Sequence, residues 1–265
     1  MTKEEATEKA LDASALDADI NVDSLWVIGP RAKGGKRENN YHGNFVPQIP
    51  SDLIRRFTKP GDVVLEPFMG SGTTLFECER LNRRYVGFDI NAEIVKLVEE
   101  KMKDGYKEYC IHQIDSGSNN AADVIAEDLK AFQRDAVDLL IAHPPYYDII
   151  KFTNQECDLS NSDSIDEFIS RYINVIKQSF QYIRKNGHLA VVVGDLYRNS
   201  EVVPLGFMLM NATMQNFKCK LKGIVVKDMV GNRAKIGLAA LWRKRALKSD
   251  NYLFKHEYLF VFRKI

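Results

Sequence analysis

Residues 143–146, His-Pro-Pro-Tyr, directly follow an apolar run that ends at Ala142. The run predicts a buried strand, so these four residues begin the loop at its carboxyl end. Two prolines restrict the backbone there and fix the carbonyl of Pro144 in space. Tyr146 adds a flat aromatic face. A rigid, aromatic loop straight after a buried strand is a candidate catalytic loop.

A second candidate site is the stretch VVLEPFMGSGTTLFE, residues 63–77. A predicted strand leads into a turn with Gly70 and Gly72, and Thr73 begins a helix. Glycines in such a turn permit positive φ and let a ligand lie against bare backbone. Asp89 ends the next predicted strand, about twenty residues further on, where a carboxylate can bind ribose hydroxyls. A third helix-opening glycine and the lysine of a triphosphate loop are both lacking, so we expect a nucleoside without a phosphate chain.

These two motifs carry a resemblance. EPFMGSGTT resembles the cofactor loop of the S-adenosylmethionine-dependent DNA amino-methyltransferases, which act on adenine N6 or cytosine N4 and usually have DPFxGSGTT. HPPY resembles their catalytic motif, in which Asp, Asn or Ser precedes two prolines and an aromatic residue. YHGNFVPQIPSDLIRRFTKPGD and HEYLFVFRK resemble the segment before the cofactor loop and the last strand of that fold. The resemblance covers roughly residues 40–265, with the cofactor loop before the catalytic loop.

The resemblance implies S-adenosyl-L-methionine as the cofactor. The methionine part would lie near Phe68, Gly70, Gly72 and Thr73. Asp89 would take the ribose, and Asp115 would lie beside the adenine ring. Glu66 stands where the family commonly has Asp, and it is expected near the cofactor amino group or holding the loop.

The catalytic residues implied by the resemblance are His143, Pro144, Pro145 and Tyr146. An exocyclic amine is a poor nucleophile, so catalysis consists mostly of positioning and polarisation. An acceptor at position 143 and the carbonyl of Pro144 would take hydrogen bonds from the amine, and Tyr146 would stack on a base flipped out of the duplex. His143 departs from the family pattern. Only a neutral imidazole can accept a hydrogen bond, so we expect activity to fall below about pH 6. As the target base, adenine is only slightly favoured over cytosine.

The surrounding elements alternate between strands and helices. Strands are predicted over 62–68, 84–90, 136–145 and 187–196, and helices over 50–58, 73–82, 91–103 and 164–185. This alternation predicts βαβ units with right-handed crossovers. The expected fold is α/β: a Rossmann-like class I methyltransferase with a mostly parallel seven-stranded sheet and helices on both faces.

Charge is unevenly distributed along the 265 residues, although the net charge is only +1. Residues 218–248 hold ten Lys or Arg and one acid, Asp228. Residues 1–40 are expected to be a tail and a basic loop, and 41–265 a single methyltransferase domain with a basic insertion at about 227–251. Double-stranded DNA is the expected partner, since basic side chains neutralise phosphates without reading sequence. The candidate DNA-binding residues are Arg31, Lys33, Lys36, Arg37, Arg233, Lys235, Arg243, Lys244 and Arg245.

Other classes of protein are disfavoured. No apolar run approaches the roughly 18 residues of a membrane span, and the N-terminus lacks the apolar centre of a signal peptide. Four scattered cysteines and five histidines show no metal-binding spacing, so we expect no metal and a cytoplasmic protein.

Two alternatives stay open. One is an RNA methyltransferase, such as a guanine-N2 enzyme of tRNA, which shares both motifs. The other is a catalytically silent DNA-binding protein, suggested by His143 and Glu66. A homodimer or partner subunit, and an accompanying restriction enzyme, would also fit a short basic segment.

Overall fold

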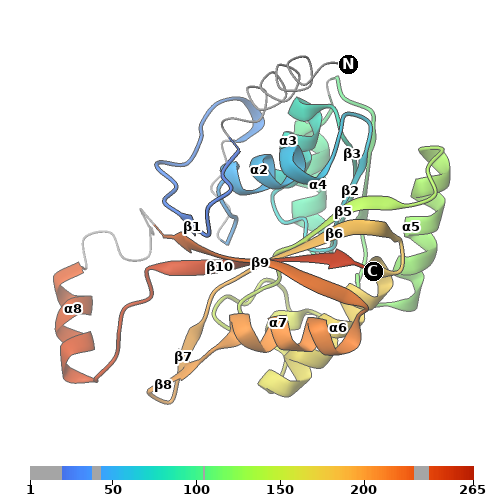
Figure 1. The fold of residues 1–265 in the computed structure, drawn as a ribbon. Helices are drawn as coiled ribbons and strands as arrows, with labels where there is room; N and C mark the ends of the chain where they lie inside the picture. The colour runs from blue at the N-terminus through green and yellow to red at the C-terminus, as the bar shows by residue number, and fades with distance from the viewer. Residues whose placement is uncertain (1–19, 38–42, 104, 230–238) are drawn as a thin grey trace, which may run out of the picture.

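The computed structural model describes residues 20–37, 43–103, 105–229 and 239–265. Its main sheet has eight strands in the order β1-β9-β10-β6-β5-β2-β3-β4, and a separate hairpin pairs β7 with β8 (Figure 1). The strands are β1 Leu25–Trp26, β2 Val63–Glu66, β3 Arg84–Asp89, β4 Tyr109–Gln113, β5 Val137–Ala142, β6 Ile183–Val193, β7 Leu196–Arg198, β8 Glu201–Val203, β9 Cys219–Asp228 and β10 His256–Lys264.

The fold class predicted from the sequence is confirmed. Strands β6, β5, β2, β3 and β4 run parallel, while β10 is antiparallel to both of its neighbours. The sheet has one strand more than the seven expected. The additional strand is β1, a two-residue edge strand parallel to β9 that buries Trp26.

Helices cover both faces of the sheet (Figure 1). They are α2 Gln48–Phe57, α3 Thr73–Leu81, α4 Ala92–Lys101, α5 Asn119–Ala131, α6 Ile165–Phe180, α7 Leu205–Asn216 and α8 Ala239–Lys248, with short 3-10 turns η1 Gly35–Arg37 and η2 Leu159–Asn161. The apolar sides of α2, α3 and α4 share one core cluster, and those of α5, α6 and α7 share the other. Among the described residues, no helix is long and apolar enough to cross a membrane.

Strands β2 and β5 mark the point where the strand order reverses. From β2 the chain builds outward through β3 to β4, then returns to place β5 on the other side of β2, with Leu65 opposite Leu140. In open α/β sheets, ligands bind outside the carboxyl ends of the strands at such a reversal. The loops after Glu66 and Ala142 therefore lie side by side at this point.

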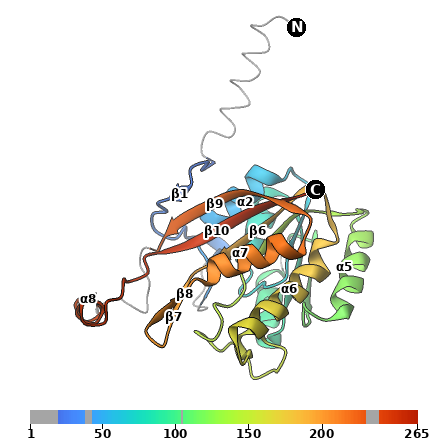
Figure 2. The same cartoon turned by 60° about the horizontal axis from the view of Figure 1, so that its bottom comes forward.

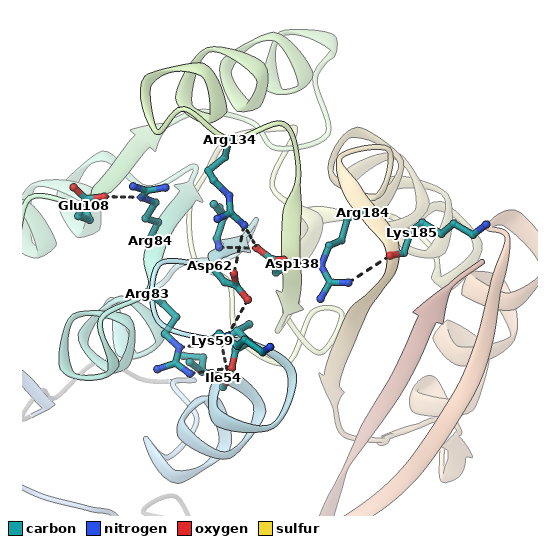
Figure 3. Close-up of polar contacts among 12 residues, drawn as sticks. Ile54, Lys59, Asp62, Arg83, Arg84, Glu108, Arg134, Asp138, Arg184 and Lys185 are labelled. Atoms are coloured by element: carbon teal, nitrogen blue, oxygen red, sulfur yellow. Dashed lines mark hydrogen bonds and ion pairs between the residues drawn. The ribbon is translucent and has the colours of Figure 1, made fainter. Parts of the chain in front are cut away.

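A network of charges closes the opposite edge of β2 and β5 (Figure 3). Asp138 is the second residue of buried β5, and its carboxylate accepts from the backbone N–H of Val63 at 3.0 Å. Arg134 and Arg184 donate to the same carboxylate at 3.1 and 2.6 Å. Because a buried carboxylate is costly unless it is paired and hydrogen-bonded, these contacts explain an acid within an apolar strand.

The predicted helix over 164–185 is too long. Helix α6 begins after the N-cap Ser164 and ends at Phe180, and β6 already starts at Ile183 rather than 187. Lys264 stabilises the carboxyl end of α6, because its ammonium donates to the carbonyls of Phe180, Gln181 and Ile183 at 2.7 to 3.0 Å. The carbonyls of Phe180 and Gln181 are among those left without partners where a helix stops.

No range was predicted for β4, α5, α7, α8, β9 or the β7–β8 hairpin. Helix α7 and the β7–β8 hairpin follow β6, and the hairpin projects beyond the sheet (Figure 2). Helix α8 lies within the predicted basic insertion, and both views show it standing away from the sheet and its covering helices.

Candidate active site

A cavity lies at the carboxyl ends of β2, β3 and β5 and encloses about 790 Å³ of empty space, part of it open to solvent. Both predicted loops line it. Of the predicted cofactor and catalytic residues, it contains Glu66, Phe68, Gly70, Thr73, Asp89, Asp115, His143 and Pro145. Gly72, Pro144 and Tyr146 lie outside the lining. A concave site at the strand ends, with several polar groups that converge on it, suits a small-molecule ligand.

Hydrogen bonds shape the loop after β2. Gly70 has φ 51° and donates its backbone N–H to Oδ2 of Asp89 at 2.8 Å. The other carboxylate oxygen of Asp89 accepts from the backbone N–H of Asn91 at 2.8 Å. Each carboxylate oxygen can accept a second hydrogen bond, so Asp89 can still receive a ligand hydroxyl. Burial raises the pKa of Asp89, and the backbone donors oppose that shift.

Gly72 ends this turn, at the point where α3 begins. It has φ 81° and precedes the first turn of α3. A Cβ at this position would lie 3.0 Å from Val98 and 3.1 Å from the ring of Phe76. The glycine is therefore required by both backbone conformation and packing.

Glu66 lies in the floor of the cavity and is 1% exposed. Thr74 and Tyr85 donate hydroxyl hydrogen bonds to its two oxygens at 2.7 and 2.6 Å. Burial raises the pKa of Glu66 to about 8, against the effect of these two donors. Glu66 thus ties the end of β2 to α3 and β3, which matches one of its two expected roles.

The hydroxyl of Thr73 supports a ligand in this cavity. Its oxygen is buried and has no hydrogen-bond partner within the described structure. Thr73 lines the cavity beside Gly70 and Glu66. Since buried polar groups are almost always hydrogen-bonded, this one suits a polar group of a bound molecule.

Asp115 lies across the cavity in the loop after β4. Its carboxylate accepts from the backbone N–H of Gly117 at 2.8 Å, and the neighbouring Ser116 donates to the carbonyl of Pro67 at 3.0 Å. The Ser116 bond joins this loop to the loop after β2. A role beside an adenine ring stays a prediction.

His143 follows the last residue of β5 and lines the cavity. Its ring lies 4.8 Å from the ring of Phe45, centroid to centroid. Burial lowers the pKa of His143 to about 4, Glu257 opposes this effect and Lys227 adds to it. His143 is therefore neutral at physiological pH, and the expected loss of activity below about pH 6 has to move toward pH 4.

Tyr146 points away from the cavity. Its hydroxyl donates to Oε2 of Glu257 at 2.9 Å and lies 3.2 Å from Nε2 of His143. A Cβ at Gly194 would meet the Tyr146 ring at 2.9 Å, so the ring packs on bare backbone. Stacking of a base on Tyr146 stays a prediction.

Two segments that frame the cavity carried weaker sequence signals. Gly43, Asn44 and Phe45 come from the segment before α2, which the resemblance placed over the methionine end of the cofactor. The second segment follows the catalytic loop and supplies Phe152, Cys157, Asp158 and Leu159. A Cβ at Gly43 would lie 3.2 Å from the Phe152 ring. The lining residues that we did not predict individually are Gly43, Asn44, Phe45, Pro67, Met69, Ser71, Ile90, Ser116, Cys157, Asp158 and Leu159. Pro67, Met69 and Ser71 lie within the EPFMGSGTT motif, and Ile90 directly follows Asp89, so these positions had a sequence signal although no role was assigned to them.

The candidate DNA-binding residues fall into two groups. In the N-terminal loop, Lys36 and Arg37 form ion pairs with Glu79 and the buried Glu77 of α3 at 2.7 and 2.6 Å. Arg31 donates to the carbonyl of Phe45, while Lys33 is exposed. Arg233 and Lys235 lie outside the described residues. Helix α8 carries four exposed cations, the predicted Arg243, Lys244 and Arg245 and, in addition, Lys248.

Comparison with known proteins bears on the same stretch of chain. The family model described as DNA methylase, N6_N4_Mtase, matches residues 2–100, which contain the loop after β2. The resemblance to the DNA amino-methyltransferases is confirmed. This chain is 35% identical over 83 residues to the Type II methyltransferase M.XycI of Xanthomonas campestris pv. cyanopsidis. The match covers 31% of this chain and 26% of that protein.

Other relatives match in the same partial way. The Type II methyltransferase M.HpaI of Haemophilus parainfluenzae is 27% identical over 126 residues, covering 48% of this chain and 36% of that protein. The chain thus matches only about a quarter to a third of the length of these relatives. A solved methyltransferase from Pyrococcus furiosus has the same fold, with a TM-score of 0.51, 12% identity and 98% of each chain covered.

Proposed function

We propose that this chain transfers a methyl group from S-adenosylmethionine to the exocyclic amine of a base in DNA, with adenine N6 ahead of cytosine N4. One observation carries the proposal: His143 and Pro145 line the same cavity as Gly70 and Asp89. The loop that would hold the cofactor and the loop that would hold the amine thereby share one space. The DNA methylase match and the Type II methyltransferase relatives support this assignment.

The cavity can hold the cofactor with residues that are already in place. Asp89 would accept the ribose hydroxyls, Thr73 would donate to or accept from a polar group, and the bare backbone at Gly70 would admit the methionine part. Bound there, S-adenosylmethionine supplies an electrophilic methyl group on a sulfonium. Residues 41–265 form the proposed methyltransferase domain.

His143 and the carbonyl of Pro144 would orient the amine. Both accept hydrogen bonds from the amino group, which turns its lone pair out of conjugation with the base. In the transfer a nitrogen–carbon bond would form, the carbon–sulfur bond would break, and the proton released by the amine would pass to water, because the lowered pKa of His143 makes it a weak base. S-adenosylhomocysteine is the second product. His143 stays neutral because burial disfavours its charged form.

Duplex DNA is the proposed substrate, with the target base flipped out. Helix α8 stands away from the body of the fold (Figure 1) and carries the exposed cations Arg243, Lys244, Arg245 and Lys248, which can contact phosphates. A duplex base lies inside its stack, so it has to leave the helix to reach a cavity at the ends of β2 and β5.

The test is transfer of a labelled methyl group by the full chain. We expect label in duplex DNA and in neither tRNA nor protein, with N6-methyladenine as the labelled nucleoside after digestion. His143→Ala is the control and should lower transfer by at least about 100-fold. Label in tRNA would assign the chain to RNA instead, and tight cofactor binding without transfer would make it a silent binding protein.

A further inference from the structure

A buried ion pair lies directly behind the catalytic loop. Lys227 of β9 and Glu257 of β10 face each other across the two strands, with Nζ 2.8 Å from Oε1. Each is 8% exposed. Replacing such a pair by apolar residues often costs little, so a buried ion pair by itself is weak support for stability. Its position next to His143 suggests a different role.

The pair fixes the direction of the hydrogen bonds that lead to the cavity. Glu257 is a carboxylate that can only accept, and Lys227 already donates to one of its oxygens. Tyr146 therefore donates its single hydroxyl proton to the other oxygen, at 2.9 Å. With that proton used, the Tyr146 oxygen can act toward His143 only as an acceptor.

His143 must then be the donor in its contact with Tyr146. Nε2 of His143 lies 3.2 Å from the Tyr146 oxygen, so a hydrogen bond requires the proton to be on Nε2. A neutral imidazole carries one proton only. Nδ1 is then the nitrogen with a free lone pair.

We propose that Glu257 and Lys227 act through Tyr146 as positioning residues, holding His143 in the tautomer whose unprotonated Nδ1 accepts a hydrogen bond from the substrate amine. This inference rests on the proposed methyl transfer. It also explains why histidine can stand where the family has Asp, Asn or Ser, since an imidazole is useful as an acceptor only in one tautomer.

Lys227 has a second effect in this arrangement. A buried carboxylate alone beside an imidazole would favour its protonated form, which cannot accept a hydrogen bond. The Lys227 charge, 2.8 Å from Glu257, offsets that influence. The two residues thus orient the imidazole through Tyr146 and keep it neutral.

Nitrogen NMR of the imidazole side chains tests the tautomer in the full chain without any nucleic acid. The His143 signals are assigned by their loss in His143→Gln. In the wild type we expect a protonated Nε2 and an unprotonated Nδ1 from pH 6 to 8. In Tyr146→Phe the hydrogen-bond acceptor is gone, so we expect a mixture of both tautomers. Glu257→Gln should give the same direction of change. A wild-type His143 protonated on Nδ1 would overturn the inference.

Kinetics separate this role from a merely structural one. Tyr146→Phe should lower kcat by at least about tenfold, as expected when a histidine loses its orienting partner, with the KM for the cofactor unchanged. Lys227→Met should move the acidic limb of the kcat profile to higher pH. Tyr172→Phe removes another buried hydroxyl, which lies 3.0 Å from Thr213, and should change neither.

The two proposals can fail separately. An Nε2-protonated His143 in a protein that methylates no nucleic acid would contradict the proposed function but not the tautomer control by Glu257, Lys227 and Tyr146. Methyl transfer to DNA with an Nδ1-protonated His143 would contradict only the tautomer control. An unchanged kcat, pH profile and tautomer in Tyr146→Phe would also contradict the tautomer control.

Discussion

The backbone N–H of Gly70 donates to Oδ2 of Asp89 at 2.8 Å, which joins the loop after β2 to the end of β3. The carboxylate therefore shapes the glycine turn and also presents lone pairs to the cavity. Sequence reasoning gave Asp89 only the second of these roles.

Replacing Asp89 should weaken cofactor binding through both roles. In Asp89→Asn the amide can present its N–H₂ group to the Gly70 N–H, so one donor loses its acceptor. We expect the Kd for S-adenosylmethionine to rise about 10- to 100-fold, as for a lost hydrogen bond to a charged group. Calorimetry measures this. The exposed Asp123→Asn on α5 is the matched control, and an unchanged Kd in Asp89→Asn would contradict the assignment.

Methyl transfer should be insensitive to pH between 5.5 and 8. Because burial lowers the pKa of His143 to about 4, its acceptor nitrogen stays free until the pH approaches that value. Single-turnover rates with saturating cofactor and DNA report this directly. In His143→Asn the limb attributed to His143 should vanish.

The same shift sets a limit on the acid range of that experiment. The unfolded chain binds a proton at His143 below about pH 6.5, whereas the native chain resists it down to about pH 4. The free energy of unfolding therefore falls as the pH drops between these values. Rates should be compared only where circular dichroism shows a folded protein. A steep loss of rate at pH 6 in folded protein would argue against the lowered pKa.

Glu66 predicts the opposite dependence of stability on pH. Its native pKa is raised to about 8, while the unfolded carboxyl has its ordinary value near 4.5. Between these values the native state binds more protons, so the free energy of unfolding decreases as the pH rises from about 4.5 to 8. Glu66→Gln removes this dependence and should gain stability relative to wild type toward pH 8. Urea unfolding at pH 5 and pH 8 measures it, and equal differences at the two pH values would refute the prediction.

Arg37 should contribute to stability and not to DNA affinity. Its guanidinium pairs with Glu77, which is 0% exposed and is also paired with Arg80. Arg37→Gln should therefore lower the free energy of unfolding by about 2 kcal/mol, less than a fully orphaned buried charge would cost. The exposed Lys33→Gln in the same loop is the control. A loss of DNA affinity without a loss of stability would restore Arg37 to the DNA-binding surface.

Helix α8 should contribute affinity that depends on salt. Replacing Arg243, Lys244 and Arg245 together by Gln removes up to three phosphate contacts, which should reduce the slope of log K against log salt by up to about 2.7 for duplex DNA. Titrations at several salt concentrations measure the slope. The control variant replaces three exposed lysines that lie on α5, α6 and β6 instead of α8, namely Lys130, Lys177 and Lys185. Equal slopes for both variants would exclude α8 from the interface.

The sequence by itself determined the α/β fold and the two strand-end loops that meet at the cavity. Strands buried on both faces are continuous apolar runs, and glycine turns are read locally, so β2, β3, β5 and the loops after them were all predictable. Asp89 and Glu66 could be identified because they stand at fixed places next to a glycine turn and a strand end.

Only the tertiary structure decided the contacts between segments far apart in the chain. Tyr146 meets Glu257 across 111 positions, and Lys227 meets Glu257 because β9 and β10 pair in one register. Likewise, the sequence predicted Lys36 and Arg37 as DNA-binding cations, and only the fold showed that both form ion pairs with carboxylates of α3. A charge or a hydroxyl is chemically the same wherever it stands, and the fold alone determines which partner lies within 3 Å of it.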